Sequence, residues 1–293
     1  MPRQTPLHAF VLLWLAGSAL AVGCEVEPAP EPSGAAGPAV VDAAGVEHSF
    51  AQPARRIISL VPAATKTIRA IGAGGALVGR TDYDTDDWVT DRPSVGGGLD
   101  PNLEAIVSLS PDLVVRFAGA QDPRTAARLD ELGIRHLAVR PDRIEDIYEM
   151  VSILGHATGH VAAADSLVRS LRNGLSEVAL AVADWPRLRV VYVLGGTPPW
   201  VAGPGTYIDE VISLIGGDNA FGDLAELYSA VSPEEFRTRS IDVVLVSSAG
   251  DFDPSMTPHA RVVAIGDLLD MPGPAIVEAA RRVARMMHGR NPR

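Results

Sequence analysis

The chain has 293 residues, which is enough for one large or two modest domains. Its hydrophobic content of 47% and charged content of 21% are ordinary for a soluble globular protein. A net charge of −11 at pH 7 argues against a nucleic-acid partner and suits a soluble exported protein.

The first 24 residues have the pattern of an export signal. Arg3 supplies a positive start, residues 9–22 form an apolar run, and small residues lead to Cys24, the only cysteine. A run this short is typical of a signal peptide rather than a membrane-spanning helix. The segment Ala21-Val22-Gly23-Cys24 resembles a bacterial lipoprotein box, which implies a lipid anchor on Cys24 after removal of residues 1–23. A plain signal peptide with an incidental cysteine is the alternative.

Residues 24–39 predict a flexible tether. They are rich in Pro, Ala, Gly and Glu and show no apolar periodicity, a composition typical of linkers. Folded structure is expected to begin near Val40. The lone cysteine also excludes an internal disulfide.

The next hundred residues alternate short β-type runs with helical patterns. Such alternation predicts a mostly parallel sheet with helices on its faces. The expected strands are 56–61, 77–79, 113–115 and 136–139, and the expected helices are 63–71, 101–106 and 124–132.

A similar order returns after Pro186. A strand is expected at 188–193, a helix at 207–214, a helix opening at Ser232 and a strand at 242–246. The offsets agree as well, because Glu104 precedes Asp112 by the same eight residues that separate Glu234 from Asp242. The repeat predicts two similarly built lobes.

A long helix over 162–185 separates the two halves. Its apolar residues recur at spacings of four, four, three and four and so share one face: Leu167, Leu171, Leu175, Val178 and Val182. We interpret it as a rigid strut between the lobes, although an ordinary surface helix has the same periodicity. The predicted fold is α/β, with two Rossmann-like lobes (40–142 and 187–293), a connecting helical region (143–186) and a ligand cleft between the lobes.

Several segments resemble the substrate-binding proteins of ABC importers for cobalamin, haem and iron–siderophores. They are Arg56-Ile-Ile-Ser-Leu-Val-Pro-Ala-Ala-Thr, Ile71-Gly-Ala-Gly, Pro101-Asn-Leu-Glu-Ala-Ile, Pro111-Asp-Leu-Val-Val, Ile215-Gly-Gly-Asp-Asn and Val231-Ser-Pro-Glu-Glu. The resemblance covers residues 40 to about 287. It implies two α/β lobes joined by one long helix, and a monomer that delivers its ligand to a permease dimer. Lys66 departs from the family, which usually has an acidic residue at that position.

Glu104 and Glu234 take matching places at helix starts. The helix dipole favours a carboxylate there without any further role. The resemblance implies instead that the two glutamates project from the lobe tips and pair with arginines of the permease.

Four aromatic residues lie in predicted loops, where core packing does not require them: Tyr83, Trp88, Trp200 and Tyr228. Flat rings in a cleft could stack on a large macrocyclic ligand, and loop anchoring is the alternative. Resemblance to the cobalamin-binding members maps Tyr83, Trp200 and Tyr228 onto cleft aromatics, and Asp267 onto a polar cleft residue. Gly97, in a run of three glycines, leaves room for a bulky ligand or lets the backbone approach it.

The ligand is predicted to be a corrinoid, most simply cobalamin, and haem or a ferric siderophore is the alternative. Siderophore binders of the family carry an arginine before the Pro-Asn-Leu-Glu stretch, where this chain has glycines, and Arg116 is a weaker candidate for an anion contact. No cofactor is expected. His156 and His160 have the spacing of metal ligands but no partner nearby, so no metal site is predicted. A metal-dependent enzyme on the same fold is the second alternative, and the sequence holds no recognisable catalytic motif to support it.

Overall fold

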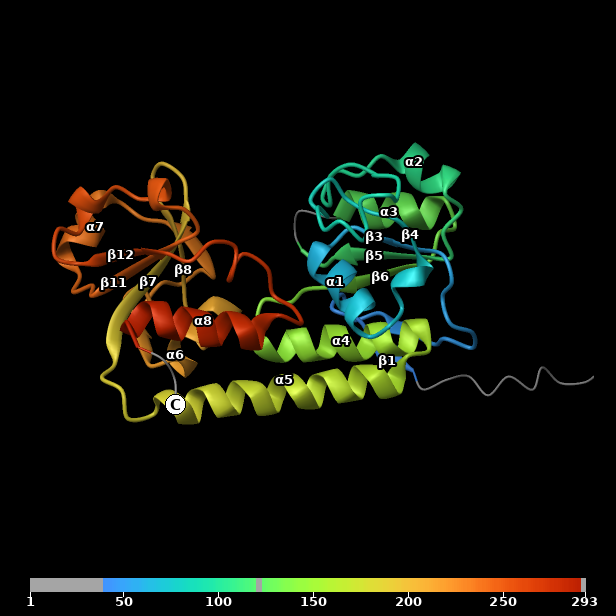
Figure 1. Cartoon of the computed structure of the whole chain (residues 1–293). Helices are drawn as coiled ribbons and strands as arrows, with labels where there is room; N and C mark the ends of the chain where they lie inside the picture. The colour runs from blue at the N-terminus through green and yellow to red at the C-terminus, as the bar shows by residue number, and fades with distance from the viewer. Residues whose placement is uncertain (1–38, 120–122, 291–293) are drawn as a thin grey trace, which may run out of the picture. The chain divides into compact units, whose positions relative to one another are not determined.

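The first part of the chain builds a four-stranded sheet whose neighbouring strands are all parallel (Figure 1). The computed structural model describes residues 39–119 and 123–290, and these belong to one compact unit. The strand order is β4-β3-β5-β6. The strands are β3 (Ile57–Ser59), β4 (Leu77–Gly79), β5 (Leu113–Phe117) and β6 (His136–Val139). We call this sheet and its helices the first lobe, and its parallel order confirms the prediction from strand–helix alternation.

Three helices of the first lobe follow the predicted sequence signals within a few residues. They are α1 (Pro62–Ala70), α2 (Leu103–Ser108) and α3 (Pro123–Glu131). Pro62 opens α1 at a position where a helix needs no N–H donor. The Asn102 side chain accepts the N–H of Ala105 at 3.0 Å and so caps α2.

A short hairpin covers the β6 edge of this sheet. It pairs β1 (Val40–Val41) with β2 (Glu47–His48). The Asp42 carboxylate in its turn accepts the N–H of Ala138, on β6, at 2.9 Å, while the N–H of Ala43 donates to the carbonyl of Ala138 at 3.1 Å. The hairpin thereby pairs backbone groups of the edge strand β6 that would otherwise be exposed.

The second lobe contains a six-stranded mixed sheet with the order β10-β8-β7-β11-β12, and β9 also pairs with β7. Its strands are β7 (Leu188–Gly195), β8 (Trp200–Ala202), β9 (Gly217–Asn219), β10 (Tyr228–Ala230), β11 (Val243–Val246) and β12 (Arg261–Ala264). β7 is parallel to β9 and β11, and β11 to β12, whereas β8 runs antiparallel to both β7 and β10.

The antiparallel ribbon of β8 and β10 was not predicted from the sequence. Each of the two strands has three residues, which is too short to display an alternating pattern. β8 also follows Pro198 and Pro199, which signal a loop.

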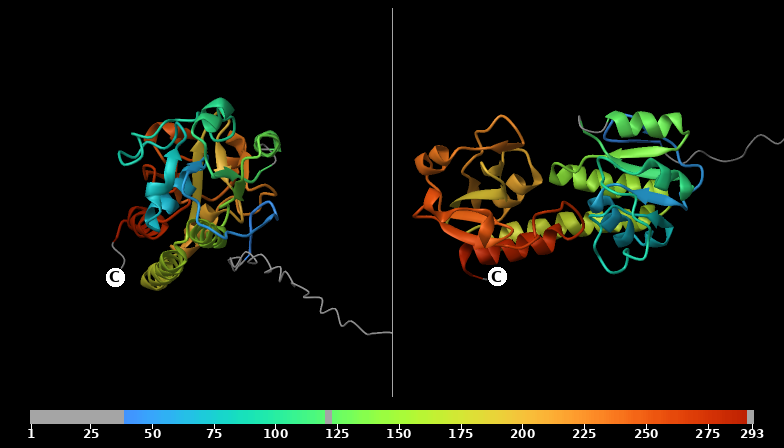
Figure 2. Two further views of the ribbon diagram at one scale, coloured as in Figure 1. Left: turned by 90° about the vertical axis from the view of Figure 1, so that its right-hand side faces the viewer. Right: turned by 90° about the horizontal axis from the view of Figure 1, so that it is seen from above.

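The long helix is α5 (Val161–Val182), and it ends three residues before the predicted limit. Its predicted apolar face is confirmed, because Leu171, Leu175, Val178 and Val182 are buried. It packs against α4 (Ile144–Thr158), which follows the first sheet, and against α8 (Ile276–His288), which ends the second lobe (Figures 1 and 2). The remaining helices are α6 (Tyr207–Leu214) and α7 (Pro233–Thr238), with single 3-10 turns at Gly74–Ala76, Ala249–Asp251 and Pro254–Met256.

The internal repeat has a structural counterpart in two aspartates. The Asp112 carboxylate accepts the N–H of Arg56, just before β3, at 3.0 Å, and Asp242 accepts the N–H of Arg189, on β7, at 2.7 Å. The N–H of each aspartate donates to the carbonyl of the same arginine. The matching offset in the sequence therefore reflects the same junction between strands in both lobes.

One hydrophobic cluster runs through both lobes and the helices between them. It joins Ile57 and Leu113 of the first sheet, Leu175 of α5, and Tyr192 and Val243 of the second sheet. No helix within residues 39–119 and 123–290 is long and apolar enough to cross a bilayer.

Candidate functional site

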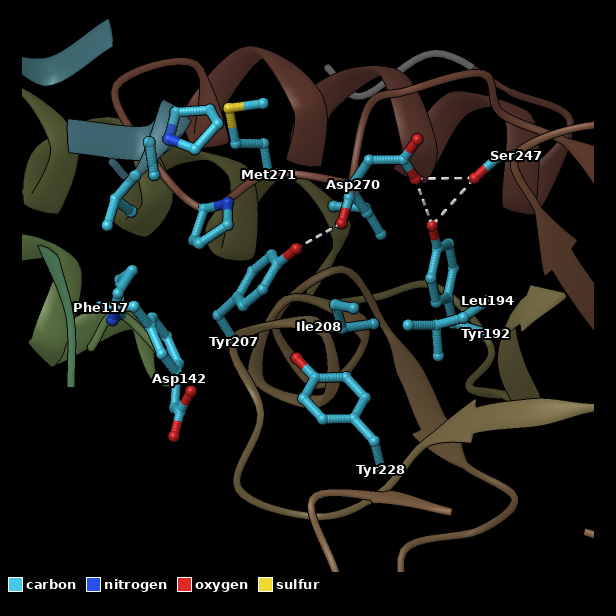
Figure 3. Close-up of a pocket in the computed structure, with 16 residues that line it drawn as sticks. Phe117, Asp142, Tyr192, Leu194, Tyr207, Ile208, Tyr228, Ser247, Asp270 and Met271 are labelled. Carbon is cyan, nitrogen blue, oxygen red and sulfur yellow. Dashed lines mark hydrogen bonds between the residues drawn. The ribbon is translucent and has the colours of Figure 1, made fainter. Parts of the chain in front are cut away.

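A cavity of about 620 Å³ opens between the two lobes (Figure 3). Most of its wall comes from residues at or just beyond the carboxyl ends of parallel strands in both sheets, which is the usual ligand position in open α/β folds. The lining residues are Val61, Pro62, Ala63, Phe117, Pro141, Asp142, Tyr192, Leu194, Tyr207, Ile208, Tyr228, Ser247, Leu269, Asp270, Met271 and Pro272.

The second sheet presents one face to this cavity. Tyr192 and Leu194 lie two residues apart on β7 and so share that face. Val193 pairs with Val201 on the opposite face. On β8, Trp200 must therefore point to the cavity side, on the same face as Tyr228, whose strand pairs with β8.

Three polar groups form a closed triangle in the wall. The Tyr192 hydroxyl donates to Asp270 Oδ1 at 2.6 Å, and Ser247 Oγ donates to the same oxygen at 2.7 Å. The two hydroxyl oxygens are 3.1 Å apart. Burial, reinforced by the hydrogen bond to Asp270, raises the pKa of Tyr192 far above its ordinary value, so this phenol stays protonated at neutral pH.

Tyr207 and Tyr228 are the other two tyrosines that line the cavity. The Tyr207 hydroxyl donates to the carbonyl of Leu269, and its backbone N–H donates to the carbonyl of Asp142 at 2.5 Å. The second bond joins α6 of the second lobe to the segment after β6. Burial raises the pKa of Tyr207 and, at Tyr228, raises the pKa to about 12. The Tyr228 hydroxyl makes no hydrogen bond to any described residue.

The charge of the cavity wall is negative. Asp142 and Asp270 line it from the two lobes, and no arginine, lysine or histidine is among the described residues that do so. Arg140 lies beside the wall, but its Nε is engaged by Asp142 Oδ2 at 2.6 Å. A ligand with N–H donors is therefore favoured over an anion.

Of the residues that the sequence pointed to, Tyr228 lines this cavity and Trp200 lies outside its wall. Trp200, the first residue of β8, is 48% exposed. Its position on the same sheet face as Tyr228 makes it a continuation of the wall toward solvent.

Tyr83 and Trp88 do not line this cavity. Tyr83 is 69% exposed. Trp88 packs against the main core, with the guanidinium of Arg69 4.6 Å and that of Arg92 6.0 Å from its ring centroid. These contacts are those of a loop anchor, the alternative that the sequence left open for Trp88.

Gly97 also lies outside the lining set, and its neighbour Gly98 shows what the glycine run does. A Cβ on Gly98 would stand 2.4 Å from the carbonyl oxygen of Leu60, so this position accepts only glycine without a backbone shift. A Cβ on Gly97 would meet only the carbonyl oxygen of Asp100, at 3.9 Å. The backbone of Gly98 thus lies close to that of Leu60, next to the segment that lines the cavity, whereas the predicted approach of the glycine run to a ligand stays a prediction.

Asp267 lines a smaller neighbouring cavity of about 180 Å³, which shares Ala63, Met271 and Pro272 with the main one. Asp270, three residues later, is the carboxylate that reaches the main cavity. The sequence analysis missed it, together with Tyr192, Tyr207, Ser247 and Asp142. A tyrosine or serine at the carboxyl end of a predicted strand was the one signal that could have found Tyr192 and Ser247.

Glu104 and Glu234 are both exposed in the first turns of α2 and α7. Glu234 forms an ion pair with Arg237 at 3.1 Å, one turn along the same helix. Cys24 lies outside the described residues.

The histidine pair does not assemble with acidic partners. His160 precedes α5, and its Nδ1 contacts the carbonyl of Thr158 at 2.9 Å. Within the described chain, no group of three or more His, Cys, Asp or Glu side chains is placed to hold a metal ion. Arg116 is buried in β5, where its Nε donates to His136 Nδ1 at 3.1 Å, and it does not line the cavity. Lys66, the departure from the family pattern, pairs with Asp86 at 3.4 Å.

Comparison with known proteins shows the family to which this chain belongs. A family profile described as periplasmic binding protein matches residues 57–259. The vitamin B12-binding protein of Vibrio cholerae is 28% identical over 243 residues, covering 79% of this chain and 88% of that protein. The crystal structure of the periplasmic vitamin B12 binding protein of Vibrio cholerae matches with a TM-score of 0.68 at 25% identity, over 80% of this chain and 97% of that one. A periplasmic haem-binding protein from Roseiflexus sp. RS-1 has the same fold, with a TM-score of 0.70 at 24% identity, over 80% of this chain and 98% of that one.

Proposed function

Because the chain belongs to the periplasmic binding protein family, we propose that it captures a corrinoid outside the cytoplasm and delivers it to an ABC importer. A relative and a solved structure named for vitamin B12 binding support this choice of ligand. The protein acts by binding and release, and no chemical step is assigned to it.

The observation that carries the proposal is the composition of the interlobe cavity. Three tyrosines, two carboxylates and apolar side chains form its wall, without a cation among the described lining residues. A corrinoid combines a flat macrocycle with many carboxamide side chains. Aromatic and aliphatic groups would pack against the ring, while phenol and carboxylate oxygens would accept amide N–H groups.

The exposed part of the sheet face extends the binding surface. Leu194 and Trp200 are each about half exposed and share the face that carries Tyr192 and Tyr228. A corrinoid is larger than the cavity itself. We therefore place one side of the ligand in the cavity and stack the remainder on Leu194 and Trp200.

Haem and ferric siderophores are the second candidates, since proteins of the same fold bind haem. Haem carries two propionates, whereas the iron of a ferric hydroxamate neutralises the oxygen anions that bind it. The wall offers propionates Asp142 and Asp270, and the neighbouring guanidinium of Arg140 is already paired with Asp142. Charge therefore favours the corrinoid over haem.

The test is a titration of the purified protein, without residues 1–23, with cyanocobalamin, haemin and ferrichrome. Absorbance and tryptophan fluorescence report binding. We expect tight, saturable binding of cyanocobalamin and weak binding of the other two. Preference for haemin or ferrichrome would refute the proposed ligand, and turnover of any of them would indicate an enzyme.

We also propose that Cys24 is lipidated and that residues 24–39 tether the binding unit to a membrane. Cys24→Ser should move the protein from the membrane fraction to the soluble fraction, because the lipid is the only anchor proposed. A processed Cys24→Ser protein that stays with membranes would contradict the anchor. A variant changed at Ser33, within the same tether, controls for effects of the substitution itself.

A further inference from the structure

The hydroxyls of Tyr192 and Ser247 and the carboxylate of Asp270 form a triangle of contacts in the cavity wall (Figure 3). Each hydroxyl carries one hydrogen, and both hydrogens point to Asp270 Oδ1, at 2.6 Å from the tyrosine and 2.7 Å from the serine. While both hydroxyls donate to Asp270, neither hydrogen is left for the 3.1 Å contact between the two hydroxyl oxygens or for a ligand.

What the triangle presents to the cavity is lone pairs and negative charge. Asp270 Oδ2 makes no hydrogen bond within the described residues, and the oxygens of Tyr192 and Ser247 keep unused acceptor capacity. Tyr192 is buried, so its orientation is held by packing. Asp142, which lies apart from the triangle in Figure 3, has its own partner in Arg140, at 2.6 Å.

A group entering this corner must bring its own hydrogens. A primary carboxamide has two N–H donors and can satisfy the triangle. A carboxylate of the same size has none, and it meets the negative charge of Asp270. The two groups are nearly identical in shape, so packing against the wall cannot separate them.

We propose that the Tyr192–Ser247–Asp270 triangle selects ligands by a carboxamide side chain and rejects the corresponding carboxylate. This inference rests on the proposed function, because it concerns which corrinoids the same cavity accepts. It would let the protein distinguish a fully amidated corrinoid from one with a free peripheral acid.

The experiment compares cyanocobalamin with the separated monocarboxylic acids that form when one peripheral propionamide is hydrolysed. Affinities are measured by titration at pH 7. For the wild type, at least one isomer should bind about tenfold more weakly or worse, the scale expected for losing a hydrogen bond to a charged group. High salt should preserve most of this ratio, whereas general repulsion by the acidic protein would be screened.

Three variants test whether the triangle, rather than another part of the protein, causes the difference in affinity between cyanocobalamin and the acids. Asp270→Asn supplies an N–H donor and removes the charge, so the affinity ratio should fall toward one. Ser247→Ala keeps the Asp270 charge, so the ratio should persist even if both affinities change. Asp184→Asn removes an equal charge in the turn after α5, away from the cavity, and should leave the ratio unchanged. Circular dichroism confirms that each variant is folded.

The outcomes distinguish the inference from the function on which it rests. Tight binding of cyanocobalamin with equal binding of every acid would overturn the inference and leave the proposed function standing. Failure of all corrinoids to bind the folded wild type would refute the proposed function itself. A ratio that survives Asp270→Asn would also overturn the role of the triangle.

Discussion

The Glu210 carboxylate, on α6 of the second lobe, accepts the backbone N–H of Ile144, at the start of α4, at 2.7 Å. Its other oxygen accepts from Arg143 Nε at 3.2 Å. A side chain of one lobe thus caps the first helix of the connecting region, close to the bond between Tyr207 and Asp142 at the cavity.

Glu210→Ala should lower the free energy of unfolding by about 1–2 kcal/mol, because α4 loses its cap and an N–H loses its acceptor. It should also weaken ligand binding, because the neighbouring hydrogen bond between Tyr207 and Asp142 joins the two lobes at the cavity. Arg143→Ala is the matched control. It removes only an exposed ion pair and should cost less than about 1 kcal/mol. Urea unfolding and ligand titration give the two readouts, and equal effects of both variants would contradict the capping role.

Trp200→Ala should weaken corrinoid binding by about tenfold to a hundredfold, which corresponds to about 1–3 kcal/mol for one large apolar side chain. Trp88→Ala should behave in the opposite way. It should leave affinity unchanged and reduce stability, because Trp88 packs on the core beside Arg69. Isothermal titration together with thermal unfolding separates the two effects. A loss of affinity in Trp88→Ala alone would place the ligand elsewhere.

Glu104→Ala combined with Glu234→Ala should abolish stimulation of the importer ATPase without changing ligand affinity, because both residues are exposed and neither lines the cavity. The assay uses the permease in lipid vesicles. Glu131→Ala on α3 is a fitting control, since Glu131 pairs with Arg128 one turn away, as Glu234 does with Arg237. A fall in ligand affinity in the double variant would instead put these carboxylates in the binding site.

Asp42→Asn should lower stability at pH 7, and its effect should shrink as the pH falls below the unfolded value near 4. Burial alone would raise the pKa of Asp42, but hydrogen bonds from the N–H of Ala138, from His48 and from the turn outweigh it and lower the pKa. A lowered folded-state pKa means that the stabilisation is complete above the unfolded value near 4 and is lost as the pH falls through the folded value. Unfolding free energies of both proteins across this range check the sign. A difference that grows at low pH would contradict it.

The sequence by itself determined the architecture in outline, because the spacing of apolar residues and the residues that begin or end a helix are local signals. The stripe from Leu167 to Val182 marked α5, and Asn102 and Ser232 marked helix starts that the structure contains. The equal offsets before Asp112 and Asp242 revealed a repeat whose basis is the same pair of backbone bonds in each lobe.

Only the tertiary structure decided which side chains meet in the cavity. Tyr192 and Asp270 are 78 residues apart, and strand order and the path of the loop after β12 bring them within a hydrogen bond. The same loop places Asp270 in the main cavity and Asp267 in its neighbour, a choice that depends on how the loop packs against α1 and α8. Trp88 and Trp200 both resemble loop aromatics in the sequence. In the structure two arginines flank Trp88, whereas Trp200 is half exposed at the start of β8.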